Sequence, residues 1–139
     1  MFAEFESKAH SLAEKGEPLT KEVLCDLYAG IGKKYYGDAI EHDYNISCEW
    51  ARIPHFYRSF YVYKYATGLT AAINIAKRIL EEGEPAVKDY FKFLSGGAST
   101  DPVSLLKLAG VDLSKTAPFE VAMAEFEQTL TEFERLMNI

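Results

Sequence analysis

Apolar residues recur at spacings of three and four along almost the whole chain, and this pattern is typical of helices that bury one face. The clearest example is the segment 119–137. It places six large apolar side chains on one helical face: Phe119, Met123, Phe126, Leu130, Phe133 and Met137. No segment shows the strict alternation of a half-buried strand. The sequence therefore predicts an all-α fold, a multi-helix bundle of about six helices with one long central helix.

Glycine, proline and capping residues predict where these helices begin and end. Thr20 and Asp101 precede apolar-periodic segments and are expected to be N-caps. Pro54 and Pro102 suit the first turn of a helix, where no backbone N–H partner is needed. The expected helices span residues 2–15, 21–36, 54–82, 86–94, 103–109 and 119–137, and a connection of mixed polarity is expected at 38–50.

Length and charge limit the classes of partner. With 139 residues the chain is expected to form a single helical domain, residues 1–139. The net charge of -6 argues against a nucleic-acid partner, because no basic stripe is present to neutralise phosphates. No apolar run approaches the ~20 residues that span a bilayer, so no membrane partner is expected. The first residues carry no export signal, which predicts a cytoplasmic protein whose Cys25 and Cys48 are reduced thiols.

The stretch "RIPHFYRSFYVYKYATG", residues 52–68, is unusually rich in tyrosine. On a continuous helix Tyr57, Tyr61 and Tyr65 would form one stripe, because residues four apart share a face. The stripe could be an aromatic core whose hydroxyls reach the surface or backbone carbonyls. It could also be a row of hydroxyl donors along a cleft wall. The spacing leaves both interpretations open.

Two other polar residues accompany this stretch. His55, expected at the start of the same helix, could donate a hydrogen bond to a substrate, although a structural histidine would show the same pattern. Arg52 could hold a carboxylate of a substrate or of the protein itself.

The sequence lacks the residues of a complete catalytic centre. It contains no His-Glu-x-x-His, and no two of His10, His42 and His55 are four residues apart, as two zinc ligands on one helix would be. No nucleophile elbow or phosphate-binding glycine loop is present. We therefore expect surfaces suited to a substrate, and no cofactor or metal site within the chain.

At "EWARIPHFYRSFYVYKYATG" the sequence resembles oligoendopeptidase F, a zinc metallopeptidase family related to thimet oligopeptidase. The segments "MFAEFE", "LYAGIGKKYYGD" and "FLSGGASTDPVSLLKLAGVD" are similar to the C-terminal region of that family, in the same order. The resemblance covers nearly the whole chain. It places Met1 at an internal methionine of the family pattern.

The resemblance implies a mostly helical enzyme in which two halves flank a deep cleft. It also implies a zinc ion held by two histidines of His-Glu-x-x-His and a downstream glutamate, all upstream of the residues present here. The chain would then be the C-terminal part of an oligopeptide-cleaving zinc endopeptidase, and it is expected to be inactive alone. Whether the chain is itself an enzyme stays open.

The resemblance also assigns roles to individual residues. His55, Tyr61 and Tyr65 would hydrogen-bond to the scissile carbonyl and to the tetrahedral intermediate, with Tyr57 and Tyr63 as alternative positions for the two tyrosines. Together with Arg52, Tyr57 and Tyr63 are expected to bind the peptide. Phe56 and Phe60 would be packing residues. The alternative is a stand-alone helical module that binds peptides, or that forms a homo-oligomer through the exposed cleft surface, without catalysis.

Overall fold

The computed structural model describes all 139 residues, and it confirms the all-α fold. It contains no strand and has one long helix in the middle of the chain. The helical elements, including two short 3₁₀ helices, are α1 (Phe2–Glu14), α2 (Lys21–Tyr36), α3 (Tyr44–Ser47), η1 (Glu49–Arg52), η2 (Pro54–Tyr57), α4 (Tyr63–Glu82), α5 (Glu84–Ser95), α6 (Pro102–Leu108) and α7 (Ala117–Met137). None of these helices has the length and the hydropathy needed to cross a bilayer.

The predicted caps are confirmed. The Thr20 hydroxyl accepts a hydrogen bond from the backbone N–H of Val23 at 3.3 Å, and the Asp101 carboxylate accepts one from Ser104 N–H at 2.9 Å. Both bonds satisfy N–H groups that the first turn of a helix otherwise leaves unpaired. Local sequence signals therefore account for the starts of α2 and α6.

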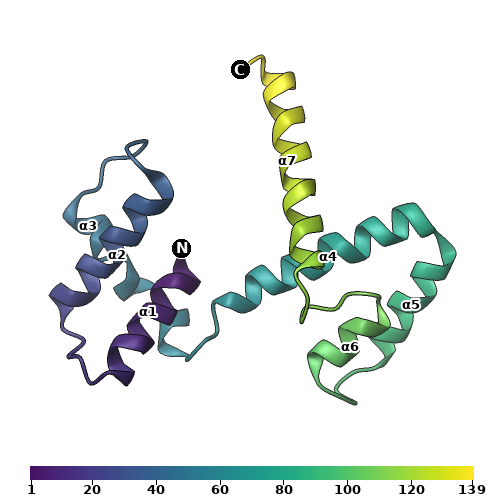
Figure 1. Ribbon diagram of the computed structural model, residues 1–139, viewed down its shortest axis with the longest axis horizontal. Coiled ribbons are helices and arrows are strands. Elements are labelled where there is room, and N and C mark those ends of the chain that lie inside the picture. Colours follow the sequence, from purple (N-terminus) through teal and green to yellow (C-terminus); the bar gives the residue numbers. More distant parts are fainter. The chain divides into compact units, whose positions relative to one another are not determined.

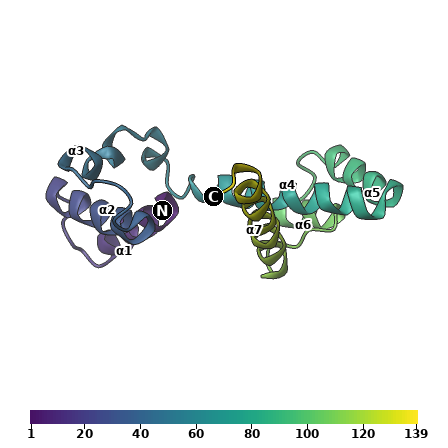
Figure 2. The same ribbon diagram turned by 90° about the horizontal axis from the view of Figure 1, so that it is seen from above.

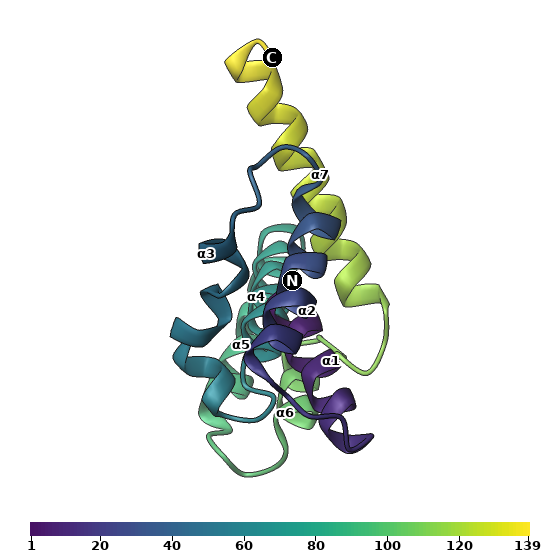
Figure 3. The ribbon, with the colours of Figure 1, turned by 90° about the vertical axis from the view of Figure 1, so that its left-hand side faces the viewer.

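The chain forms two compact units, Met1–Lys64 and Tyr65–Ile139. The expectation of a single domain stays a prediction. In the first unit α1 lies beside α2 (Figure 1), and α3 also lies beside α2 (Figure 3). The core of this unit is aromatic. Phe5, Tyr28 and Ile31 are buried, and the side chains packed against them include Trp50 and Phe56, so the packing role predicted for Phe56 is confirmed.

The second unit contains α5, α6, α7 and almost all of α4. Helices α5 and α6 lie side by side (Figure 2), and the buried residues of the unit are mostly small. Two hydrogen bonds join α4 to the segments around it. Asn74 donates to the carbonyl of Pro118 at 2.8 Å, and Arg78 Nη1 donates to the carbonyl of Ala109 at 2.6 Å. These bonds attach the start of α7 and the end of α6 to α4.

The predicted helix 54–82 begins later than expected, and this corrects the prediction. Residues 54–57 form the 3₁₀ helix η2, residues 58–62 are not helical, and α4 starts only at Tyr63. The interruption contains two non-helical backbones: Arg58 is extended, with φ −129° and ψ 107°, and Phe60 is left-handed, with φ 54°. The Phe60 N–H donates to Glu6 Oε1 at 2.7 Å, and its ring stacks on His10 with centroids 4.2 Å apart.

Candidate functional site

The interruption at Phe60 changes the arrangement of the predicted tyrosine stripe. Tyr57 lies in η2, Tyr61 lies in the non-helical segment, and Tyr65 lies on α4. The three tyrosines are therefore not successive positions on one helical face, and His55 does not open the long helix. The prediction of one continuous stripe was wrong, because it assumed helical backbone through Phe60.

The structure does bring His55 and Tyr61 together. Their rings are stacked, with centroids 5.7 Å apart and an angle of 26° between the planes. The Lys64 ammonium lies 4.9 Å from the centroid of the Tyr61 ring, on which it makes a cation–π contact. A cavity of about 210 Å³ is lined by Pro54, His55, Arg58 and Tyr61. An imidazole and a phenol thus share one small concave surface, and both can donate a hydrogen bond to a carbonyl oxygen.

Tyr57 has a different environment. The residue is 74% exposed, and its hydroxyl donates to the backbone carbonyl of Ala51 at 2.9 Å. That donation uses the only proton of the phenol, so toward a ligand the Tyr57 oxygen can act as an acceptor only. A peptide N–H would suit it and a peptide carbonyl would not.

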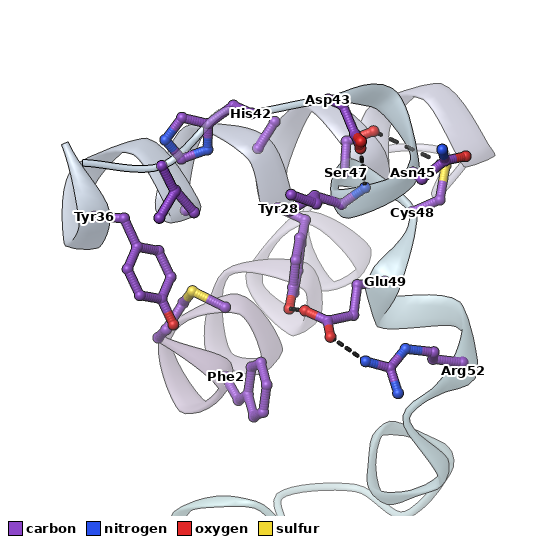
Figure 4. Close-up of a pocket in the computed structure, with 15 residues that line it drawn as sticks. Phe2, Tyr28, Tyr36, His42, Asp43, Asn45, Ser47, Cys48, Glu49 and Arg52 are labelled. Atoms are coloured by element: carbon purple, nitrogen blue, oxygen red, sulfur yellow. Dashed lines mark hydrogen bonds and ion pairs between the residues drawn. The ribbon is translucent and has the colours of Figure 1, made fainter. Parts of the chain in front are cut away.

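Arg52 forms an ion pair with Glu49, one helical turn earlier. Glu49 also accepts a hydrogen bond from the Tyr28 hydroxyl at 2.7 Å, as the dashed lines in Figure 4 show. Tyr28 is 1% exposed, and burial together with the Glu49 carboxylate raises the pKa of its phenol. The buried Tyr28 thus helps to hold Glu49, and Glu49 orients the guanidinium of Arg52. Because that side chain is 76% exposed and carries five N–H donors, it can hold a second carboxylate as well.

Tyr63 and Tyr65 are exposed and lie in the first turn of α4. Residues two apart on a helix point in roughly opposite directions, so the two phenols do not share a face. Their roles toward a peptide remain predictions.

The sequence did not indicate a second, larger cavity in the first unit. It measures about 670 Å³, and α1, α2 and the segment 40–52 line it (Figure 4). Tyr28, Glu49 and Arg52 form part of its wall. Spacing could not reveal this cavity, because its walls come from separate segments. One feature of its wall could have been found from spacing: Glu49 and Arg52 stand three residues apart, as a local ion pair does.

The residues present do not fit a zinc site of their own. No group of three or more His, Cys, Asp or Glu side chains could hold a metal ion. The histidines have separate contacts, since His10 stacks on Phe60, His55 stacks on Tyr61, and His42 Nε2 donates to the carbonyl of Gly37 at 2.9 Å.

Comparison with known proteins identifies similar sequences along almost the whole chain. The sequence profile of Peptidase family M3 matches residues 1–125. The Oligopeptidase PepF of Bacillus subtilis is 50% identical over 137 residues, which are 99% of this chain and 20% of that protein. An oligoendopeptidase F homolog of Borreliella burgdorferi is 44% identical over 138 residues, 99% of this chain and 23% of that protein.

A solved structure is also similar. The crystal structure of oligoendopeptidase-F from Enterococcus faecium matches with a TM-score of 0.92 and 48% sequence identity, over 99% of this chain and 26% of that chain. The chain therefore spans about a fifth to a quarter of the length of these relatives.

Proposed function

The chain belongs to peptidase family M3, and on that premise we propose that it supplies part of the substrate-cleft wall of a zinc metalloendopeptidase that cleaves oligopeptides. The observation that carries this proposal is the stacked pair of His55 and Tyr61 at a small cavity, in a chain of which 99% matches an oligopeptidase and an oligoendopeptidase F homolog. The relatives' names supply the substrate class, oligopeptides.

In this proposal His55 and Tyr61 act as hydrogen-bond donors to the carbonyl of the peptide bond that is cleaved. A donor aimed at the oxygen that becomes negatively charged lowers the barrier, typically by about 2.7–4 kcal/mol for each oxyanion donor. The stack restricts the two rings before a peptide binds. Each side chain therefore loses less conformational entropy on binding. Tyr65, in the first turn of α4, is proposed as a further donor.

The other predicted residues would bind the peptide away from the reacting bond. Arg52, oriented by Glu49, suits a carboxylate of the substrate. Tyr57 suits a backbone N–H, because its own proton is donated to Ala51. Tyr63 would contribute an exposed aromatic surface.

The zinc ion that the family uses would be held by residues outside these 139, because the residues present offer no group of ligands for it. It would supply the activation of water and of the scissile carbonyl. Alone, the chain is therefore proposed to bind peptides weakly and not to cleave them.

A chimera tests the proposal. The matched 137 residues of the Bacillus subtilis Oligopeptidase PepF would be replaced by those of this chain, and hydrolysis of a fluorescence-quenched oligopeptide would be measured. We expect the folded chimera to cleave the peptide. A folded, zinc-loaded chimera without activity would contradict the proposal, and so would zinc-dependent cleavage by the isolated chain.

Self-association is a second candidate function, and the surface of α7 favours it. The predicted apolar face of this helix is exposed from Phe119 to Met137. Contiguous exposed apolar surface of this kind favours contact with another chain. Sedimentation velocity over a range of concentrations tests this candidate. A monomer at every concentration would exclude homo-oligomers of the isolated chain.

A further inference from the structure

The only two cysteines of the chain lie in direct contact. The Sγ atoms of Cys25 and Cys48 are 3.1 Å apart, although 23 positions separate them in the sequence. From this geometry we infer that Cys25 and Cys48 form a redox-modification site, at which a hydroperoxide converts the two thiols into an intramolecular disulfide. The inference is independent of the proposed peptidase role.

The two sulfur atoms already lie close to bonding distance. Cys25 lies in α2, and Cys48 lies between α3 and η1, a segment that lies beside α2. A disulfide bond is about 2.03–2.05 Å long, so the two sulfur atoms need to approach by only about 1 Å. Cys48 follows a helix of one turn, where a small backbone shift disturbs little regular structure.

The two thiols have unequal environments, which gives each a distinct role. Cys25 is 5% exposed and contacts the indole N–H of Trp50 at 3.5 Å. Burial raises the pKa of the Cys25 thiol, which favours its protonated form, and this form can donate a hydrogen bond to the Cys48 sulfur. Cys48 is partly exposed and lies in the wall of the 670 Å³ cavity (Figure 4).

The groups around Cys48 favour its thiolate. The hydrogen bond from Cys25 lowers the pKa of the Cys48 thiol, and contacts with Tyr44 and Ser47 and the charge of Lys21 act in the same direction. A thiolate is the nucleophilic form of cysteine. Cys48 is therefore the thiol that reacts first with an oxidant from solution.

The reaction balances in two steps. The Cys48 thiolate attacks one oxygen of hydrogen peroxide, the O–O bond breaks, and hydroxide leaves, so Cys48 becomes a sulfenic acid. The Cys25 sulfur then attacks the Cys48 sulfur, the S–O bond breaks, and the Cys25 proton leaves with the hydroxyl group as water. The hydroxide of the first step takes up the proton that Cys48 lost, so two thiols are oxidised to one disulfide and one hydrogen peroxide is reduced to two molecules of water. A reducing thiol restores the pair by exchange.

The experiment treats the folded, reduced 139-residue chain with hydrogen peroxide and then measures free thiols, intact mass and tryptic peptides. We expect both thiols to be lost, the mass to fall by two hydrogen atoms, and the peptides 22–33 and 35–52 to be linked. Dithiothreitol should restore both thiols. Thiols that stay titratable, or disulfides that link only separate chains, would overturn the inference.

Two single variants separate the roles of the cysteines. In Cys25→Ser, Cys48 should accumulate as a sulfenic acid that dimedone traps, because no second thiol is present to react with it. In Cys48→Ser, the buried Cys25 should react far more slowly. Equal dimedone labelling of Cys48 in the wild type and in Cys25→Ser would overturn the inference. The measurement on the wild type stands even if a variant fails to fold.

Discussion

The carboxylate of Glu6 accepts a hydrogen bond from the backbone N–H of Phe60 at 2.7 Å, across 54 positions of sequence. Phe60 has a left-handed backbone, which costs a residue with a side chain about 1–2 kcal/mol. The bond to the buried carboxylate offsets that cost. Glu6 therefore holds the segment that carries His55 and Tyr61. It also keeps the residues before Tyr63 from joining α4 as additional helical turns.

Removing this carboxylate should destabilise the first unit. Glu6 is 4% exposed, so Glu6→Ala leaves the N–H of Phe60 without its acceptor in a site that water reaches poorly. A hydrogen bond to a charged group contributes about 1.5–3 kcal/mol, and we expect a loss of that size in urea unfolding. Glu6→Gln retains an acceptor and should lose less. Glu14→Ala, at an exposed position of the same helix, is the control and should change little. Equal effects of Glu6→Ala and Glu14→Ala would contradict this role.

Gly110 should not tolerate a side chain. Its φ is +80°, and a Cβ there would overlap the Arg78 guanidinium that donates to Ala109. We expect Gly110→Ala to lower the free energy of unfolding by at least about 1 kcal/mol. Gly30→Ala is the matched control, because a Cβ on this glycine of α2 meets no atom within 4 Å. It should instead stabilise the chain, by roughly 0.5–1 kcal/mol. Urea titration followed by circular dichroism measures both, and the same sign for the two variants would refute the argument.

Glu4 should make the stability of the chain depend on pH in acid. It accepts hydrogen bonds from Lys8 at 2.7 Å and Lys34 at 2.9 Å, and these ammonium groups lower the pKa of its carboxyl from 4.5 to about 2. Between these values the unfolded chain binds a proton that the folded chain does not. The stabilisation by Glu4 is therefore fully present above about pH 4.5 and is lost as the pH falls through about 2.

The measurement compares the unfolding free energies of the wild type and Glu4→Gln at low salt, at several pH values. Their difference should be constant above pH 4.5 and shrink toward pH 2. Glu14→Gln, which removes an exposed carboxyl without an ion pair, should show no such change. A difference that stays constant down to pH 2 would contradict the assignment.

The disulfide between Cys25 and Cys48 should stabilise the oxidised chain. Closing a loop between positions 23 residues apart reduces the entropy of the unfolded state, which corresponds to about 3 kcal/mol in the chain-entropy model. Urea titration of the oxidised and reduced chains measures the difference. Cys48→Ser, treated with the same oxidant, should show none. An oxidised chain that unfolds at the same urea concentration as the reduced chain would contradict this prediction.

Sequence patterns predicted the parts of this structure that local interactions determine. Thr20 and Asp101 cap the helices that they were expected to cap, because each capping bond spans only three residues. The start of α4 was not predictable in this way. The bond that holds Phe60 comes from Glu6, and no local signal near Pro54 reports a partner so distant in sequence.

The same distinction applies to the candidate site. The sequence indicated His55 and Tyr61 individually, but it predicted that both lie on the long helix. In the structure that helix begins only at Tyr63. Their stacking depends on the non-helical backbone around Phe60. Cys25 and Cys48 were expected to be reduced thiols, and their contact follows from the packing of α2 against the segment that contains Cys48.

The most direct test of the central claim is the turnover number of the chimera described above with Tyr61→Phe. This change removes one hydroxyl and retains the ring on which His55 stacks. If Tyr61 donates to the developing oxyanion, kcat should fall by about 10²-fold or more. Tyr35→Phe, at an exposed tyrosine of α2, should leave kcat unchanged. A Tyr61→Phe chimera that is as active as the Tyr35→Phe control would contradict the proposed role of this segment in the cleft wall.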